Sequence, residues 1–360
     1  MRAAVFHNGD MNVQELPEPV PQAGQVLVRT VCCGICGSDL HAAKYTQQFT
    51  DVARRAGSRF TLDGARPVVF GHEFCCEVLE HGPGNAGTLK PGTLVCSVPM
   101  TIAGQTVHGL GYNNDVPGGF AERMVLAERM LLPVPNGLPA DHAALTEPMA
   151  VGWHAVCNAR LEANDVALVI GCGPVGLAVI AALRIAGVQP IIAADFSPAR
   201  RALALKMGAD SVIDPAQDSP YRSWREAATP PGYDPSRYAQ MLGTSPKLRP
   251  GVIFECVGMP GLIQQLAAGA MLKSRIVVVG VCMQTDTFEP YFGIVKELNL
   301  QFVLGYTPDE FAASLRHIAE GRIDVSPLIT GHVGLDGIAA AFEELASPEQ
   351  HAKILVEPWR

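Results

Sequence analysis

The chain has 360 residues, of which 48% are hydrophobic and 17% charged, and its formal net charge is −8. This length predicts two domains of roughly 150 to 200 residues. A mildly acidic chain without a Lys/Arg-rich run argues against a nucleic-acid partner or an anionic membrane partner. No run of about 18 apolar residues predicts a membrane span.

The start of the chain has no apolar stretch typical of a signal peptide. The ten Cys are too few for a disulfide framework in a chain of this size. Several of them, including Cys75, Cys76, Cys157, Cys172 and Cys282, lie in apolar runs and are expected to be buried thiols. We therefore expect a protein of the reducing cytoplasm.

The first 150 residues predict strands and turns. Residues 25–31 alternate apolar and polar side chains, as a half-buried strand does. Further extended segments are expected at 67–70, 74–79 and 93–98. This part therefore predicts a β-rich domain whose loops carry polar groups.

The pattern changes near Glu147, and a helix is expected at 149–159. Short apolar strands are then expected at 166–170, 190–194, 211–213, 252–256 and 275–281, and helices at 174–186, 198–207 and 261–271. Strands that alternate with helices predict an α/β fold with a doubly wound parallel sheet. The polar, Pro-rich stretch 214–250 is interpreted as a long solvated surface loop.

A first chemical signal lies at 34–41, with the sequence Gly-Ile-Cys-Gly-Ser-Asp-Leu-His, followed by Gly-His-Glu at 71–73. Cys36, His72 and Glu73 provide the sulfur, nitrogen and oxygen donors that zinc takes. Each piece alone has a simpler interpretation, a turn or a hydrogen-bonded core histidine. Together they predict a metal site.

A second signal is the glycine pattern GxGxxG, formed by Gly171, Cys172, Gly173, Pro174, Val175 and Gly176. It follows an apolar strand and opens an apolar helix, and Asp195 ends the next strand, as a dinucleotide fold requires. Asp195 can accept hydrogen bonds from ribose hydroxyls and would repel a 2′-phosphate, which favours NAD. Arg200 and Arg201 could in principle hold that phosphate, although a solvated helix face is the simpler interpretation.

With both halves in view, the chain resembles the medium-chain, zinc-dependent alcohol and polyol dehydrogenases, and most closely their sorbitol, threonine and butanediol dehydrogenase branch. The markers are 34–41, 71–73, 118–122, 147–155, the glycine pattern, 254–258 and 327–330. The resemblance implies a GroES-like β-barrel catalytic domain at 1–150, an inserted Rossmann domain at 151–300, and a return to the catalytic domain at 301–360.

The resemblance also implies residue roles. Cys36 and His72 match zinc ligands, Glu147 stands at the position of a third protein ligand, and Glu73 either binds zinc or waits beside it. The alternative for Glu147 is an acid favoured by the helix dipole. Ser38 would accept the proton of the alcohol, and His41 would relay it towards solvent. The expected cofactor contacts are Gly171, Gly173, Pro174, Val175, Gly176, Asp195, Arg200, Val257 and Gly280.

The implied activity is hydride transfer between NAD(H) and a small-molecule secondary alcohol or polyol, or the matching ketone. Two alternatives stay open: a zinc-free reductase of activated double bonds on the same fold, and a non-catalytic nucleotide-binding relative. Relatives also form homodimers or homotetramers, commonly through Rossmann edge strands, which here would follow Gly280.

The chain departs from the family pattern in two places. Many relatives hold a structural zinc in a lobe with four Cys, whereas residues 95–119 contain only Cys96, with His108. One thiolate cannot build such a site, so one zinc per subunit is predicted. Residues 45–66 are longer than in most relatives and predict an insertion with a short helix at 47–56. It could line the substrate entrance or decorate the surface.

Overall fold

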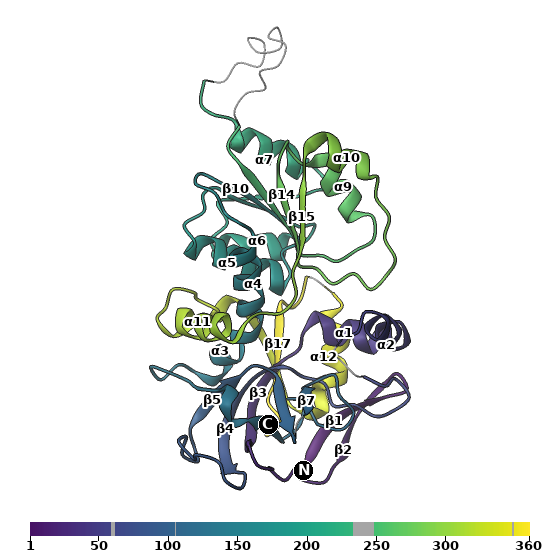
Figure 1. Ribbon diagram of the computed structural model, residues 1–360, viewed down its shortest axis with the longest axis vertical. Helices are drawn as coiled ribbons and strands as arrows, with labels where there is room; N and C mark the ends of the chain where they lie inside the picture. Colours follow the sequence, from purple (N-terminus) through teal and green to yellow (C-terminus); the bar gives the residue numbers. More distant parts are fainter. Residues whose placement is uncertain (59–61, 105, 233–247, 348) are drawn as a thin grey trace. The chain divides into compact units, whose positions relative to one another are not determined.

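The computed structural model describes residues 1–58, 62–104, 106–232, 248–347 and 349–360. It divides into two compact units, and Figure 1 colours the chain by residue number. The first unit consists of 1–150 and 307–360, and the second unit of 151–306. Among the described helices, none combines the length and the apolar character needed to cross a membrane.

A seven-stranded sheet forms the centre of the first unit. Its strands follow the order β16-β17-β3-β4-β5-β9, and β8 pairs with β3. Their bounds are Gln25–Gly34 (β3), Glu73–His81 (β4), Leu94–Ser97 (β5), Arg123–Ala127 (β8), Leu131–Pro133 (β9), Ile329–Val333 (β16) and Lys353–Val356 (β17). The last strand, β17, pairs antiparallel with β3, with Leu355 opposite Gly34. The C-terminal segment is thus built into the same sheet as the N-terminal one.

Smaller elements surround this sheet. They are the hairpins β1 (Arg2–His7) with β2 (Asp10–Glu15) and β6 (Met100–Ala103) with β7 (Thr106–Gly109), and the helices α1 (Gly37–Lys44), α2 (Thr46–Arg55), α3 (Ala140–Ala144), α11 (Pro308–Ala319) and α12 (Ile338–Leu345). The helix expected at 47–56 is present as α2. The segment expected at 67–70 makes only an isolated bridge, in which Val68 pairs with Phe6. It cannot continue as a ladder, because Pro67 has no N–H and Gly71 turns the chain with φ +98°.

The second unit contains a six-stranded parallel sheet in the order β12-β11-β10-β13-β14-β15. The strands are β10 (Val166–Ile170), β11 (Ile191–Ala194), β12 (Ser211–Ile213), β13 (Gly251–Glu255), β14 (Arg275–Val278) and β15 (Asn299–Phe302). The helices are α4 (Thr146–Asn158), which begins in the first unit, α5 (Pro174–Ile185), α6 (Pro198–Lys206), α7 (Pro220–Ala228), α9 (Leu262–Gly269) and α10 (Pro290–Lys296). The central strands are almost entirely buried, because helices cover a parallel sheet on both faces.

Three expectations for the second unit need correction. Part of the stretch interpreted as a solvated loop is α7, whose Trp224 is fully buried and donates from Nε1 to the carbonyl of Val166 at 2.8 Å. Trp224 and Ala228, four residues apart, bury one face of this helix, so it belongs to the core. Residues 233–247 of that stretch lie outside the described residues. The strand expected at 275–281 ends at Val278.

The third correction concerns Cys157, which is exposed rather than buried. It lies on α4, where successive residues point in different directions, so buried neighbours in sequence do not predict its burial. Cys75, Cys76 and Cys172 are buried as expected, and Cys282 is half-buried.

Candidate active site

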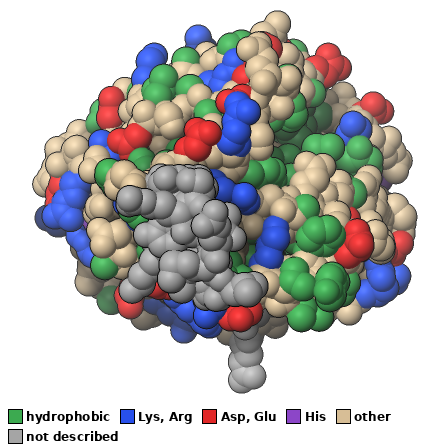
Figure 2. All heavy atoms as spheres, turned by 90° about the horizontal axis from the view of Figure 1, so that it is seen from above, with side chains coloured by type: hydrophobic (Ala, Val, Ile, Leu, Met, Phe, Trp, Pro, Cys, Tyr) green, Lys and Arg blue, Asp and Glu red, His purple; other side chains and the backbone are tan. Residues whose placement is uncertain are grey.

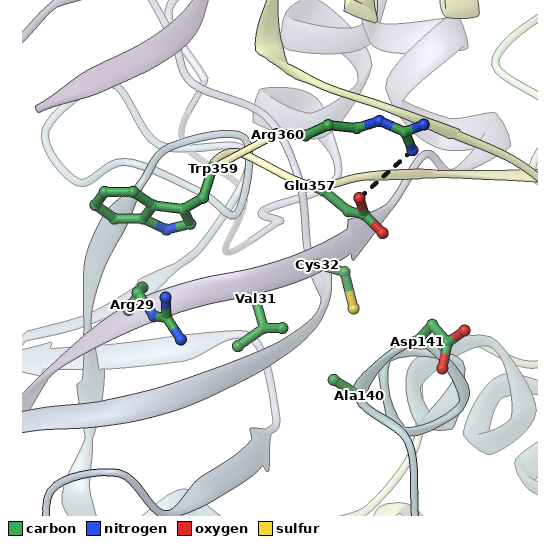
Figure 3. A pocket seen from close by; sticks show the side chains of 8 residues that line it. All are labelled: Arg29, Val31, Cys32, Ala140, Asp141, Glu357, Trp359 and Arg360. Atoms are coloured by element: carbon green, nitrogen blue, oxygen red, sulfur yellow. Dashed lines mark ion pairs between the residues drawn. The ribbon is translucent and has the colours of Figure 1, made fainter.

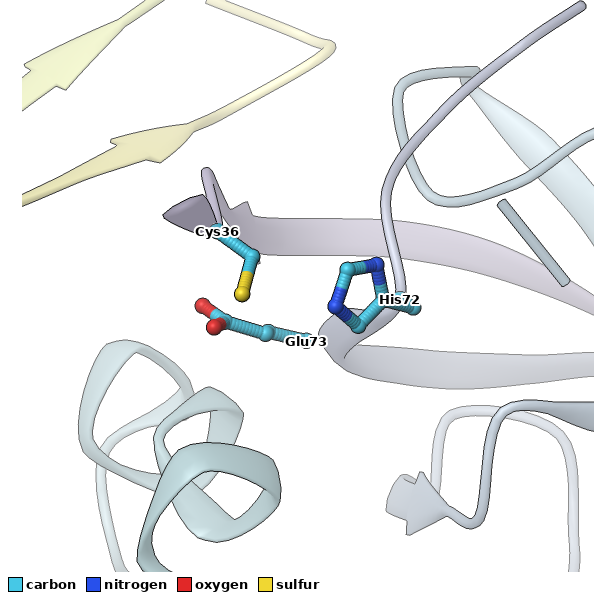
Figure 4. A group of neighbouring side chains, drawn as sticks. All are labelled: Cys36, His72 and Glu73. Carbon is cyan, nitrogen blue, oxygen red and sulfur yellow. The ribbon is translucent and has the colours of Figure 1, made fainter. Parts of the chain in front are cut away.

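The side chains of Cys36, His72 and Glu73 meet at one end of the β3–β4 pair in the first unit. Each offers a possible ligand atom, and these atoms all lie within 4.8 Å of one another (Figure 4). Cys36 is the N-cap of α1, two residues after the end of β3, His72 immediately precedes β4, and Glu73 is the first residue of β4. Because Gly34 stands opposite Glu73 in the ladder, the two segments meet by strand pairing.

Gly34 is required for this close approach. A Cβ at Gly34 would lie 2.1 Å from Glu73 Oε2, which is far inside any permitted contact. The glycine therefore leaves room for the carboxylate beside Cys36. This gives the Gly-x-Cys spacing a steric reason independent of metal binding.

Asp39 contacts both Cys36 and His72. Its Oδ2 accepts a hydrogen bond from the Cys36 backbone N–H at 3.0 Å, and its Oδ1 lies 3.3 Å from His72 Nδ1. Burial alone would lower the pKa of His72, but Asp39 and then Cys36 raise it well above its usual value. A carboxylate at Nδ1 leaves the other ring nitrogen, Nε2, available as a metal ligand. Sequence reasoning missed Asp39, although it lies within the motif at 34–41.

Lys353 contacts the Glu73 carboxylate from β17. Its Nζ donates to Glu73 Oε1 at 2.8 Å, to Oε2 at 2.6 Å and to the Ile35 carbonyl at 3.0 Å. Burial lowers the pKa of Lys353, but the charges of Glu73 and Cys36 raise it above its usual value overall. No local sequence signal marks this lysine, which lies far along the chain in an apolar strand.

Glu147 lies outside the group of three donors. It is in the first turn of α4 and 9% exposed, and its charge also raises the pKa of Lys353. Within the described residues, the set whose ligand atoms lie within 4.8 Å of one another contains Glu73 and not Glu147.

Ser38 is half-buried in the first turn of α1. The hydroxyl of Tyr112 donates to its Oγ at 2.8 Å. His41 is three residues further on α1 and exposed, and no hydrogen bond joins it to Ser38 in the described part of the chain. Partial burial, and then the charge of Lys44, lower the pKa of His41, so a neutral imidazole is favoured. Tyr112 was not predicted, because its loop carries no recognisable motif.

The glycine pattern lies in the second unit, where β10 ends and α5 begins. Gly171 has φ +91°, and a Cβ at Gly176 would lie 1.9 Å from the Gly171 carbonyl oxygen. A Cβ at Gly173 would instead meet open space, with a guanidinium nitrogen of Arg200 at 4.0 Å. Pro174 and Val175 open the helix. The loop therefore presents open space beside a helix N-terminus, the arrangement that binds a pyrophosphate.

Asp195 lies beside this loop. Its Oδ2 accepts a hydrogen bond from the Cys172 N–H at 2.7 Å, and its Oδ1 accepts one from the Ser197 N–H at 2.8 Å. The Arg201 guanidinium donates to the backbone carbonyl of Asp195 and forms an ion pair with Asp214. Its charge is therefore already paired within the protein. The Nε of Arg200 is buried and has no hydrogen-bond partner in the described part of the chain.

Val257 and Gly280 lie together at the carboxyl ends of β13 and β14. A Cβ at Gly280 would lie 2.8 Å from the Val257 nitrogen and 2.8 Å from Glu255 Oε2. Glu255 is buried, and its Oε1 accepts hydrogen bonds from the N–H groups of Val257 (2.6 Å) and Gly258 (2.8 Å). Burial raises the pKa of Glu255. Sequence reasoning missed this carboxylate, which orders the loop after β13.

A cavity of about 420 Å³ in the first unit is separate from these residues. It is lined by Arg29, Val31, Cys32, Ala140, Asp141, Glu357, Trp359 and Arg360 (Figure 3). Glu357 pairs with Arg360, and the guanidinium of Arg29 lies over the Trp359 ring. None of the proposed catalytic or metal-binding residues lines it, so we assign the active site to the donor group rather than to this cavity.

Known proteins match the chain along nearly its whole length. Residues 22–136 match the family profile described as an alcohol dehydrogenase GroES-like domain, and 174–320 match a zinc-binding dehydrogenase profile. The (R,R)-butanediol dehydrogenase of Bacillus subtilis is 32% identical to this chain, and the match covers 99% of this chain and 100% of that enzyme. The enzyme of the same name from Neisseria gonorrhoeae is 30% identical, with 99% of both chains covered.

Solved structures agree with this result. The crystal structure of 2R,3R-butanediol dehydrogenase from Bacillus subtilis has a TM-score of 0.78 and 29% identity, with 99% of both chains covered. A putative zinc-binding dehydrogenase from Sinorhizobium meliloti, solved with NADP, has a TM-score of 0.79 and 24% identity over 99% of both chains, and supports the fold alone.

The chain therefore belongs to the zinc-dependent medium-chain alcohol dehydrogenases. The predicted family and the predicted pairing of a GroES-like domain with a Rossmann sheet are confirmed. The protein is an oxidoreductase that transfers a hydride between NAD(H) and a secondary alcohol or the matching ketone, with zinc as its metal.

Proposed function

We propose that Cys36, His72 and Glu73 hold the catalytic zinc. The observation that supports this most directly is that a thiol, an imidazole and a carboxylate place their ligand atoms within 4.8 Å of one another. Three protein donors that leave a fourth position open are typical of catalytic zinc. When bound, zinc polarises the substrate oxygen and NAD⁺ accepts the hydride. Glu147 is kept as an alternative carboxylate ligand, because it lies close enough to affect Lys353.

We propose that Ser38 accepts the proton of the alcohol. Its hydroxyl lies two residues from Cys36 on the same helix turn, and Tyr112 holds it. His41 is proposed to pass the proton to solvent, since its lowered pKa favours the neutral form that can accept one. This transfer needs water or a cofactor hydroxyl to join the two side chains.

We propose that the nucleotide binds at Gly171, Gly173, Pro174, Val175 and Gly176, with Asp195 on the ribose and Val257 and Gly280 beside the nicotinamide. Two features support this. One is the open space at Gly173, and the other is the position of the motif at the carboxyl end of β10, where the strand order reverses because β11 lies on one side of β10 and β13 on the other. Arg200 is proposed to bind a phosphate of the cofactor.

For the substrate we propose a small vicinal diol or the matching hydroxyketone. The support is the name shared by relatives that match the full chain, (R,R)-butanediol dehydrogenase, together with a diacetyl reductase that forms (R)-acetoin. The test is NADH formation from (R,R)-2,3-butanediol, sorbitol, L-threonine and 1-phenylethanol under identical conditions. Faster turnover of sorbitol or L-threonine than of the diol would contradict the assignment.

We also propose that the enzyme is a cytoplasmic homodimer or homotetramer. The second unit has exposed apolar side chains on α10 and on and after β15: Tyr291, Ile294, Phe302 and Leu304. Figure 2 shows one face of the molecule, on which hydrophobic side chains lie among charged ones. Because β15 is an edge strand of its sheet, a second copy could pair with it. Sedimentation analysis of the wild-type protein and of Phe302→Asp tests this surface.

A further inference from the structure

The loop between β7 and β8 places one tyrosine against the proposed catalytic serine. Tyr112 is 5% exposed, and its hydroxyl donates to Ser38 Oγ at 2.8 Å, with Asp39 Oδ1 as a second acceptor at 3.2 Å. In the described part of the chain, Tyr112 is the side chain that forms a hydrogen bond with the Ser38 hydroxyl. Tyr112 lies in the segment where many relatives would carry a four-Cys zinc lobe.

The ring of Tyr112 is fixed by aromatic neighbours on two sides. Phe49 stacks against it with ring centroids 5.4 Å apart and planes at 28°, and the His72 ring lies 5.2 Å away. Phe49 is the buried residue of α2, the helix of the 45–66 insertion. The insertion therefore reaches the proposed proton-transfer group through one aromatic contact.

A serine hydroxyl on a helix can occupy several staggered rotamers, which point its oxygen in different directions. A buried donor at 2.8 Å favours one of them, because an alternative rotamer would break this hydrogen bond, which is shorter than the one from the phenol to Asp39 Oδ1 at 3.2 Å. Burial and the nearby Asp39 raise the pKa of Tyr112 well above its usual value, in agreement with a phenol that remains a donor.

We propose that Tyr112 is a positioning residue for the dehydrogenase reaction, which fixes the direction of Ser38 Oγ, and that the insertion helix α2 holds Tyr112 in place through Phe49. This inference rests on the proposed role of Ser38 in proton transfer. It gives the insertion a function, namely support of the Ser38 hydroxyl through Phe49 and Tyr112.

The experiment is a double-mutant cycle with Tyr112→Phe, Ser38→Ala and the double variant, measured with (R,R)-2,3-butanediol and NAD⁺. Tyr112→Phe keeps the ring and removes one oxygen. We expect kcat to fall about 10- to 100-fold, as for a misplaced catalytic group, with the KM for NAD⁺ and the zinc content unchanged. Because Tyr112 acts through Ser38, adding Tyr112→Phe to Ser38→Ala should change kcat by less than about twofold.

Two further variants complete the design. Tyr221→Phe, at a half-buried tyrosine on α7 of the second unit, is the matched control and should keep wild-type kinetics. Phe49→Leu retains the Tyr112 hydroxyl and should lower kcat by a smaller factor, again only when Ser38 is present. It keeps the inference testable if Tyr112→Phe proves unstable.

The possible outcomes separate the two levels of the proposal. Wild-type kcat in Ser38→Ala would overturn the proposed proton transfer itself. A loss in Ser38→Ala together with unchanged kcat in Tyr112→Phe would overturn only the role of Tyr112. Equal losses from Tyr112→Phe with and without Ser38 would also overturn it, because a general structural effect does not depend on that hydroxyl.

Discussion

Lys353 and Glu73 form a buried ion pair, with Nζ 2.6 Å from Oε2 and side chains only 2% and 1% exposed. A buried charge without a partner is strongly unfavourable, so each of the two requires the other. The pair also joins β17 to β4, which are separated by β3 in the sheet. Glu73 is thus both a proposed zinc ligand and the counterion of the C-terminal strand.

Lys353→Met tests this dependence. Removing the ammonium leaves the Glu73 carboxylate buried beside the Cys36 thiol, and we expect the free energy of unfolding to fall by about 3 to 5 kcal/mol. The matched control is Lys273→Met, whose partner Glu297 is 65% exposed, and this variant should lose less than about 1 kcal/mol. Urea unfolding of the metal-free proteins measures both, and equal losses would contradict a special role for Lys353.

The proposed metal group predicts which variants lose zinc. Cys36→Ser and His72→Ala should each reduce bound zinc from one ion per subunit to well below one and abolish turnover. Cys157→Ser, at the exposed thiol on α4, should keep both. Atomic emission of the dialysed proteins gives the zinc content. Two tightly bound ions in the wild-type protein would contradict the single site, and retained zinc in Cys36→Ser would exclude that ligand.

Asp195→Asn addresses cofactor choice. The amide keeps an oxygen acceptor for one of the two backbone N–H groups that Asp195 holds, those of Cys172 and Ser197, and it removes the charge. Loss of the charge weakens hydrogen bonds to ribose hydroxyls and removes repulsion of a 2′-phosphate. We expect the ratio of kcat/KM for NAD⁺ to that for NADP⁺ to fall roughly 10- to 100-fold. Asp210→Asn is the control, because Asp210 also accepts a backbone hydrogen bond next to β11. An unchanged ratio would argue that Arg200 decides the choice.

Glu255→Gln predicts a pH-dependent gain in stability. Burial raises the folded-state pKa of Glu255, so the folded protein holds this proton more tightly than the unfolded chain does. The favourable contribution is complete below the ordinary value of 4.5 and is lost as the pH rises through the folded pKa. The amide oxygen can still accept from Val257 and Gly258, without the buried charge.

The variant should therefore unfold at higher urea concentration than the wild type at pH 7, and the difference should shrink near pH 4. Urea titrations of both proteins at the two pH values measure this change. Glu320→Gln is the control, since Glu320 is exposed and pairs with Arg322 at the surface. A difference that stays constant between the two pH values would contradict the assignment to this carboxyl.

Much of the fold could be predicted because it is encoded locally. The strand at 166–170, the glycine pattern and the helix at 174–185 follow one another in sequence, so adjacent residues determine the cofactor loop. Cys36, His72 and Glu73 were also predictable, since pairing of two neighbouring strands brings them together.

The rest depends on contacts between segments far apart in the sequence. Lys353 lies in a short apolar strand, where nothing nearby indicates that its ammonium faces Glu73. Tyr112 is in a loop without periodicity, and its importance follows only from its position beside Ser38. The helix at 220–228 was hidden by a polar, Pro-rich context, and Trp224 as an anchor becomes clear only once β10 is in place. Edge strand β15 alternates weakly because most of it is exposed.

The return of the chain to the first sheet also has a consequence for folding during synthesis. Residues 151–306 form a unit that is continuous in sequence, whereas β3 and β4 await β17 before Glu73 gains its counterion. At about 5 to 20 residues per second, the ribosome needs roughly 10 to 40 s to proceed from residue 150 to Lys353. The second unit can therefore complete its contacts while the sheet of the first unit still lacks β17, and the Glu73 carboxylate gains its counterion only after Lys353 has been synthesised.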